Sequence, residues 1–97
     1  MKNFRTYNLA LASYKKAKSL SLKGALRDQF ERASLSVVLN LNEGSAKFSR
    51  KDRKKFYNIA LGSFRECQSI LEIIENKTLL EEADVLGAHL YMLAIKT

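Results

Sequence analysis

Breaks in regular structure are scarce along this chain. Its 97 residues contain no proline and only four glycines, Gly24, Gly44, Gly62 and Gly87. An all-β fold needs many tight turns, and such turns are rich in glycine and proline. The sequence therefore predicts an all-α protein in which a few long helices are joined by short connections.

Apolar residues recur at intervals of three and four in four successive segments, which places them on one face of each predicted helix. We predict helices over about residues 3–19, 22–43, 50–75 and 79–95. Ser21, Ser49 and Thr78 are candidate N-caps, and Gly44 is a candidate left-handed residue after the second helix. Four helices with short connections favour a single domain, residues 1–97, folded as an antiparallel up-down-up-down four-helix bundle.

The second predicted helix is apolar around most of its circumference, since Leu35, Val38 and Leu39 lie outside its main apolar stripe. A helix with so wide an apolar surface is normally buried, yet a bundle of this size leaves every helix a solvent face. We therefore expect this helix to be central, or to turn part of its surface towards another subunit.

Positive charge is concentrated in one part of the chain. The formal net charge is +7, and residues 1–65 hold fifteen of the 17 Lys and Arg residues but only four of the 10 acidic residues. The densest cluster comprises Lys47, Arg50, Lys51, Arg53, Lys54 and Lys55. Most of it falls in the first turns of the third helix, where positive charge opposes the helix dipole. Binding of nucleic-acid phosphates would explain the cluster, and a solvated charged corner is the alternative.

Two aromatic residues near the cluster, Phe48 and Tyr57, could stack on bases or pack in the core. The turn at Gly44 followed by a basic helix also occurs in helix-turn-helix DNA readers. A recognition helix is usually short, however, whereas this helical pattern continues to Glu75, so that interpretation is less favoured.

The sequence shows no catalytic or metal-binding constellation. His89 is the only histidine and Cys67 the only cysteine, so neither a multi-histidine metal site nor a Ser-His-Asp triad is indicated. The glycines are too widely spaced to form a phosphate-binding loop. We expect no enzymatic activity, no metal and no cofactor, with Cys67 as a buried core residue.

The lone cysteine excludes an intrachain disulfide and fits a reducing compartment. The first residues contain no apolar signal-peptide core, and no apolar run approaches membrane-spanning length. We therefore expect a soluble, cytoplasmic protein without a membrane partner.

A second group of residues is predicted to serve packing and register. A glycine inside a helix costs up to about 1 kcal/mol relative to alanine, so we expect a close helix approach at Gly62-Ser63. Arg32 and Glu66, or Arg65 and Glu43, are candidates for buried ion pairs. The whole group comprises Gln29, Arg32, Asn40, Glu43, Gly44, Gly62, Ser63, Arg65 and Glu66.

These residues also carry a resemblance to a known family. The pattern begins with Gln29-x-x-Arg32-Ala33-x-x-Ser36-x-x-x-Asn40-Leu41-x-Glu43-Gly44-Ser45, continues with Asp52-Arg53-x-x-Phe56-Tyr57-x-Ile59-Ala60-x-Gly62-Ser63-x-Arg65-Glu66, and ends with Leu86-Gly87-Ala88-His89-Leu90-Tyr91. It resembles the bacterial four-helix-bundle proteins encoded within intervening sequences of 23S ribosomal RNA genes. The accessory variability determinant proteins of diversity-generating retroelements share this signature.

The resemblance implies an antiparallel four-helix bundle that assembles into a ring-shaped homopentamer with a basic surface. In the retroelement branch it also implies binding to a reverse transcriptase and to RNA. Asn42 stands where the family commonly has alanine, and Ala46-Lys47 replaces the usual small residue followed by arginine. These departures leave the branch open.

Together, the residues and the resemblance predict a non-enzymatic homo-oligomeric accessory or scaffold protein. It is expected to bind nucleic acid, RNA in preference to DNA, through the cluster between Lys47 and Lys55. The alternative is a protein-interaction adaptor whose basic face docks an acidic partner, such as a reverse transcriptase, without contacting nucleic acid.

Overall fold

The computed structural model describes residues 4–97, which fold into four helices joined by short connections. The helices are α1 (Phe4–Ser19), α2 (Gly24–Ser45), α3 (Arg50–Ile73) and α4 (Lys77–Lys96). The all-α prediction is confirmed over these residues, and the predicted start of the first helix at Asn3 lies outside them. None of the four helices combines the length and the hydropathy that crossing a membrane requires.

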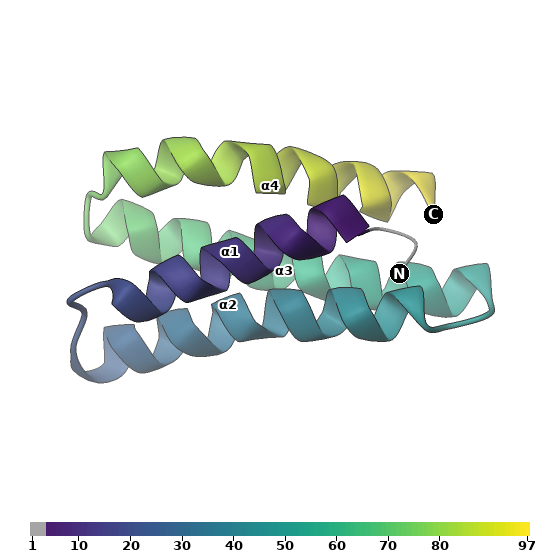
Figure 1. Cartoon of the computed structure of the whole chain (residues 1–97), viewed down its shortest axis with the longest axis horizontal. Coiled ribbons are helices and arrows are strands. Elements are labelled where there is room, and N and C mark those ends of the chain that lie inside the picture. Colours follow the sequence, from purple (N-terminus) through teal and green to yellow (C-terminus); the bar gives the residue numbers. More distant parts are fainter. Residues whose placement is uncertain (1–3) are drawn as a thin grey trace.

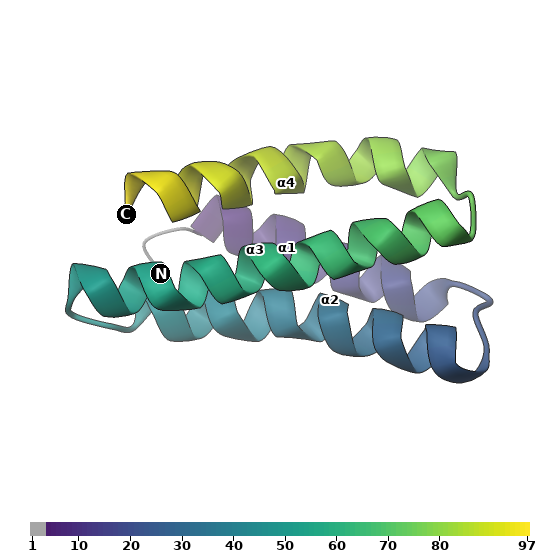
Figure 2. The ribbon, with the colours of Figure 1, turned by 180° about the vertical axis from the view of Figure 1, so that it is seen from behind.

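Each helix packs against two others, and the pair formed by α2 and α3 is the most extensive. α1 packs on α2 and less extensively on α4, and α4 packs on α3. The α2–α3 connection lies at one end of the molecule, and the other two connections lie at the opposite end (Figures 1 and 2). In both views, α3 and the α2–α3 connection extend beyond the first turn of α1 and the last turn of α4. The α2–α3 hairpin therefore projects from its end of the bundle.

The core is built from all four helices, with Leu41, Tyr57 and Leu90 as its largest fully buried side chains. Val38 belongs to this core, although it lies outside the main apolar stripe of the predicted second helix. Leu35 and Leu39 remain 37% and 52% exposed. In a single chain, the exposed apolar surface of α2 is therefore smaller than the sequence predicted. The core residues are Ala10, Val37, Val38, Leu41, Tyr57, Ala60, Phe64, Leu86 and Leu90 in one cluster, and Ala17, Phe30, Ala33, Cys67, Ile70 and Leu71 in the other.

The ends of α2 differ from their prediction. The helix begins at Gly24, whose φ is +62°. The N-cap position is Lys23, which is extended and forms no side-chain cap hydrogen bond, so Ser21 is not the N-cap. At the other end α2 continues through Gly44 to Ser45, and Gly44 is not left-handed. Gly44 is instead buried against α3, where a Cβ atom would lie 2.8 Å from Cε1 of Tyr57. This glycine therefore permits a close approach of the two helices.

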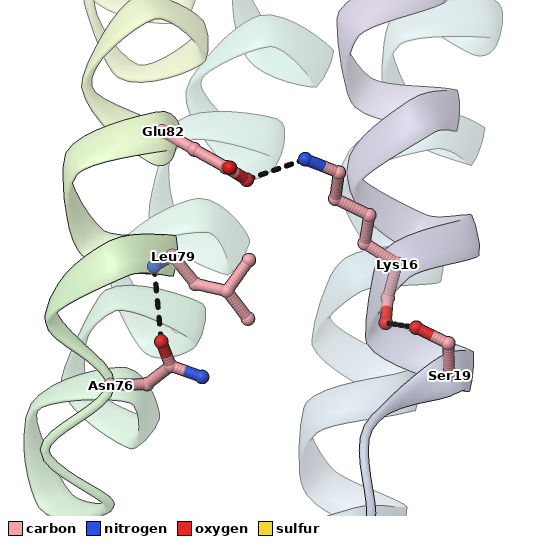
Figure 3. Close-up of polar contacts among 5 residues, drawn as sticks. All are labelled: Lys16, Ser19, Asn76, Leu79 and Glu82. Atoms are coloured by element: carbon pink, nitrogen blue, oxygen red, sulfur yellow. Dashed lines mark hydrogen bonds and ion pairs between the residues drawn. The ribbon is translucent and has the colours of Figure 1, made fainter.

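The α3–α4 connection also differs from its prediction. Glu75 is the left-handed residue, with φ of 56°, and the N–H of Asn76 donates to the carbonyl of Leu71 at 3.0 Å. This bond is typical of a Schellman helix end. The side chain of Asn76 then accepts from the N–H of Leu79 at 3.0 Å (Figure 3), so Asn76 rather than Thr78 caps α4.

An ion pair joins α1 to α4 near the same end of the bundle. Lys16 donates to the carboxylate of Glu82, and the hydroxyl of Ser19 donates to the carbonyl of Lys16 at 2.7 Å (Figure 3). Both charged side chains are about half exposed. The pair therefore contributes at most about 1 kcal/mol to the contact between α1 and α4, which is the least extensive of the helix contacts.

Candidate nucleic-acid interface

The predicted basic cluster occupies the α2–α3 connection and the start of α3, and we refer to residues Lys47–Lys55 as the hairpin tip. The hydroxyl of Ser49 accepts from the N–H of Asp52 at 3.0 Å, which confirms Ser49 as the N-cap of α3. Because the α2–α3 hairpin projects from the bundle, α1 and α4 do not cover the tip (Figures 1 and 2). The cluster is thus presented on a capped and regular helix start.

Arg53 has a structural role within the tip. Its Nη1 donates to the carbonyl of Phe48 at 2.6 Å and to the carbonyl of Lys47 at 3.2 Å. The side chain is half-buried and reaches back across the turn that precedes α3. Its charge therefore serves two backbone acceptors, which leaves Arg53 less suited to bind a ligand than its position in the sequence implied.

Lys47 and Lys55 are held in part by Phe56. Their Nζ atoms lie 5.2 and 5.8 Å from the centre of its ring, within the range of cation–π attraction. The Nζ of Lys47 also lies 3.4 Å from a carboxylate oxygen of Glu43, one turn earlier in the chain. Both contacts are weak at exposed positions, about 1 kcal/mol or less each. A polyanion could therefore recruit these two lysines at small cost.

Arg50, Lys51 and Lys54 are the unengaged cations of the tip. All three side chains are exposed, and none forms a hydrogen bond or an ion pair with another described residue. Their spacings of three and four residues place Lys54 beside both Arg50 and Lys51 on the surface of α3. The fold thus brings three unneutralised positive charges together at a projecting corner.

The two candidate stacking residues have opposite environments. Tyr57 is only 2% exposed and packs in the core against Gly44, so it is not available for a ligand. Phe48 has a relative exposure of 101%, which means that no other part of residues 4–97 covers its ring. Phe48 is therefore the accessible aromatic residue of the tip.

The residues assigned to packing and register separate into three groups. Gly44 is buried, and Ser63 and Asn40 are half-buried in a hydrogen-bonded layer between α2 and α3. In this layer the hydroxyls of Ser36 and Ser63 lie 2.7 Å apart, and the amide of Asn40 donates to the carbonyl of Ser36 at 2.8 Å. The exposed residues are Gln29, Arg32, Glu43, Gly62, Arg65 and Glu66.

Two expectations about these residues are wrong. A Cβ atom at Gly62 would meet nothing within 4 Å, so this glycine does not permit a close helix approach, although the adjoining Ser63 contacts Ser36 of α2. Neither proposed ion pair is present among the described residues, because Arg32, Arg65 and Glu66 point into solvent and Glu43 lies beside Lys47 instead. Close approach occurs at Gly44 and at Gly87, where a Cβ would lie 2.8 Å from Cε2 of Phe64.

The residues that could perform chemistry are dispersed. Within residues 4–97, no three His, Cys, Asp or Glu side chains lie close enough to hold a metal ion. Cys67 is buried, as predicted, and burial raises the pKa of its thiol, while a contact with the Ser34 hydroxyl at 3.5 Å offsets part of that rise. His89 lies beside Thr6 and Met92 in a groove next to α1.

A single family match covers α1, α2, α3, the hairpin tip and most of α4. The model of the family described as 23S rRNA-intervening sequence protein matches residues 4–92. The chain belongs to this family. The predicted resemblance to the 23S rRNA intervening-sequence proteins is thus confirmed, and the match includes the whole cluster from Lys47 to Lys55. Comparisons of this 23S rRNA-intervening sequence family member with curated proteins and with solved structures give no match.

Proposed function

We propose that the protein is a non-enzymatic accessory or scaffold protein, an antiparallel four-helix bundle that binds RNA through its hairpin tip. The observation that carries this proposal is the set formed by Arg50, Lys51 and Lys54, three exposed cations without an ion-pair partner in the described chain. Each cation in the first turns of α3 opposes the helix dipole, at a cost of a few tenths to about 1 kcal/mol. Contacts with phosphates would compensate for that cost, whereas helix stability gives no reason for cations at these positions.

The family supports RNA as the polyanion. Its name refers to sequences that intervene in 23S rRNA. Lys and Arg bind the phosphates of RNA and of DNA without reading the bases, so the cations by themselves do not distinguish the two nucleic acids. RNA is thus the first ligand to test, with DNA of the same sequence as the comparison.

We further propose that the chain acts as a homo-oligomer, with the pentameric ring implied by the resemblance as the expected assembly. Leu35 and Leu39 support an interface on α2, because they are exposed apolar residues on the second helix of a single chain. A ring would repeat the tip around one axis. Several weak sites could then engage one RNA molecule and raise the overall affinity.

Charge reversal tests the proposal. The tip variant carries Arg50→Glu, Lys51→Glu and Lys54→Glu. The control carries Lys15→Glu, Lys23→Glu and Lys77→Glu, an equal change in net charge at exposed positions towards the opposite end of the bundle. In a filter-retention assay with 23S rRNA fragments, the tip variant is expected to lose retention and the control to keep it. Equal retention by the two variants would overturn the proposal.

The adaptor hypothesis predicts a different result. An acidic protein would remain bound to the wild type in nuclease-treated lysate and would be lost from the tip variant. A reverse transcriptase is the partner expected if the chain belongs to the retroelement branch. This outcome, combined with no RNA retention by the wild type, would replace the RNA-binding proposal.

A further inference from the structure

Phe48 has no packing role that accounts for it. It occupies the position immediately before the N-cap Ser49. An apolar residue at that position usually packs on the fourth residue of the helix as a hydrophobic staple. Here the fourth residue is Arg53, and the ring of Phe48 is 101% exposed, so no staple forms. The chain thus places a large apolar side chain entirely in water.

The backbone on both sides of Phe48 is nevertheless held in place. Arg53 binds the carbonyls of Lys47 and Phe48, and the next residue, Ser49, caps α3. A side chain attached to an ordered backbone loses less conformational freedom on binding than one in a mobile loop. The ring is therefore presented on a fixed support that projects from the bundle.

Cations flank the exposed ring in the sequence. Arg50 and Lys51 follow it by two and three residues in the chain, and both are exposed and unpaired within the described part of the protein. An aromatic ring beside cations matches the two chemical parts of an unpaired nucleotide, whose base stacks on aromatic rings and whose phosphate attracts lysine and arginine. The bases of a duplex are already stacked on one another and do not offer a free face.

We infer that Phe48 stacks on an unpaired base, so that the hairpin tip selects single-stranded over double-stranded RNA. This inference rests on the proposed function and specifies its ligand. Because every base has a π-face, the contact tolerates different sequences. The cations bind phosphates of either form of RNA, and Phe48 distinguishes the two forms.

A membrane surface is the other partner that an aromatic residue beside cations could meet. Interfacial membrane binding usually requires a continuous apolar face formed by several residues. At the tip, the side chains adjoining Phe48 in sequence are Lys47 and Ser49, and the neighbours beyond them are Ala46 and Arg50. A single ring with polar neighbours suits a base better than a bilayer.

Fluorescence anisotropy with a labelled 12-nucleotide RNA, free or annealed to its complement, tests the inference. The wild type is expected to bind the single strand more tightly than the duplex. Phe48→Ala should weaken single-strand binding by about 5- to 150-fold, the range for loss of a stacking aromatic, and should leave duplex binding unchanged. Phe48→Tyr should retain the preference, whereas Phe48→Leu, which lacks a π-face, should lose it. Thermal melting of all three variants should match the wild type, because the ring is fully exposed.

The outcomes separate this inference from the proposed function. If the wild type and Phe48→Ala each bound the single strand and the duplex with equal affinity, the stacking role of Phe48 would be overturned. RNA binding by the tip would remain intact. Absence of binding to either RNA would overturn both. Wild-type binding to phosphatidylserine vesicles that Phe48→Ala abolishes, with single-strand binding unchanged, would assign the ring to a membrane instead.

Discussion

The guanidinium of Arg53 donates a hydrogen bond to the carbonyl of Phe48 over 2.6 Å. This contact separates the basic cluster into residues with different roles. Arg53 fixes the turn that supports the hairpin tip, whereas Arg50, only three residues earlier, forms no hydrogen bond or ion pair with another described residue. Positive charge within one short segment thus serves both structure and, in our proposal, binding.

Arg53→Ala is expected to lower the free energy of unfolding by about 1–2 kcal/mol, because two backbone carbonyls lose a charged donor. Arg50→Ala should change it by no more than about 0.5 kcal/mol, as is usual for an exposed side chain without hydrogen bonds or ion pairs. Urea denaturation followed by circular dichroism measures both. Equal effects of the two substitutions would show that the Arg53 contacts do not stabilise the turn.

Gly44 in α2 and Gly62 in α3 should respond in opposite directions to replacement by alanine. Gly44→Ala places a methyl group within 3 Å of the buried Tyr57 ring and should destabilise the fold by about 1–3 kcal/mol. Gly62→Ala meets nothing within 4 Å and should stabilise it by about 0.5–1 kcal/mol, since alanine favours an exposed helix position. Thermal melting of the two variants tests this pair, and stabilisation by Gly44→Ala would contradict the described packing.

The buried thiol of Cys67 predicts a loss of stability in alkaline solution. Its folded pKa is raised because burial disfavours the thiolate. Between the unfolded pKa of about 8.5 and the higher folded value, the unfolded chain binds fewer protons than the folded chain, so stability falls as pH rises. Unfolding free energies from pH 8 to 10 should fall more steeply for the wild type than for Cys67→Ala. Parallel profiles would show that the thiol does not titrate differently on folding.

The apolar surface of α2 gives a test of assembly. Leu39→Glu should dissociate the proposed oligomer, because a charge would be buried in the interface. Val85→Glu, at a position of similar exposure on α4, serves as the control, since α4 makes no contact with α2 in the described bundle. Size-exclusion chromatography with light scattering measures the subunit number. A wild-type monomer would contradict the proposed assembly.

Much of the fold could be predicted because it follows from local patterns. Apolar spacing indicated the four helices, and the Ser49 cap could be recognised because its partner, Asp52, lies three residues away. Gly44 could not be interpreted in the same way. Glycine serves equally as a left-handed helix end or at a close helix approach, and only the position of Tyr57 on the next helix distinguishes these roles.

The candidate site was likewise predictable as a group and not residue by residue. The spacing of charges identified the cluster, but the spacing does not show that Arg53 turns back onto the carbonyl of Phe48. Nor does it show that Tyr57 is enclosed while Phe48 is fully exposed. These differences depend on how α2 and α3 meet, which is a tertiary property.

The salt dependence of RNA binding tests the central claim most directly. Each phosphate contact with a single strand contributes about 0.7 to the slope of log K against log salt concentration. Replacing Arg50, Lys51 and Lys54 with alanine should therefore reduce the magnitude of the slope by about 2, whereas alanine at Lys15, Lys23 and Lys77 should leave it unchanged. A slope in the first variant equal to that of the wild type would contradict RNA binding through the hairpin tip.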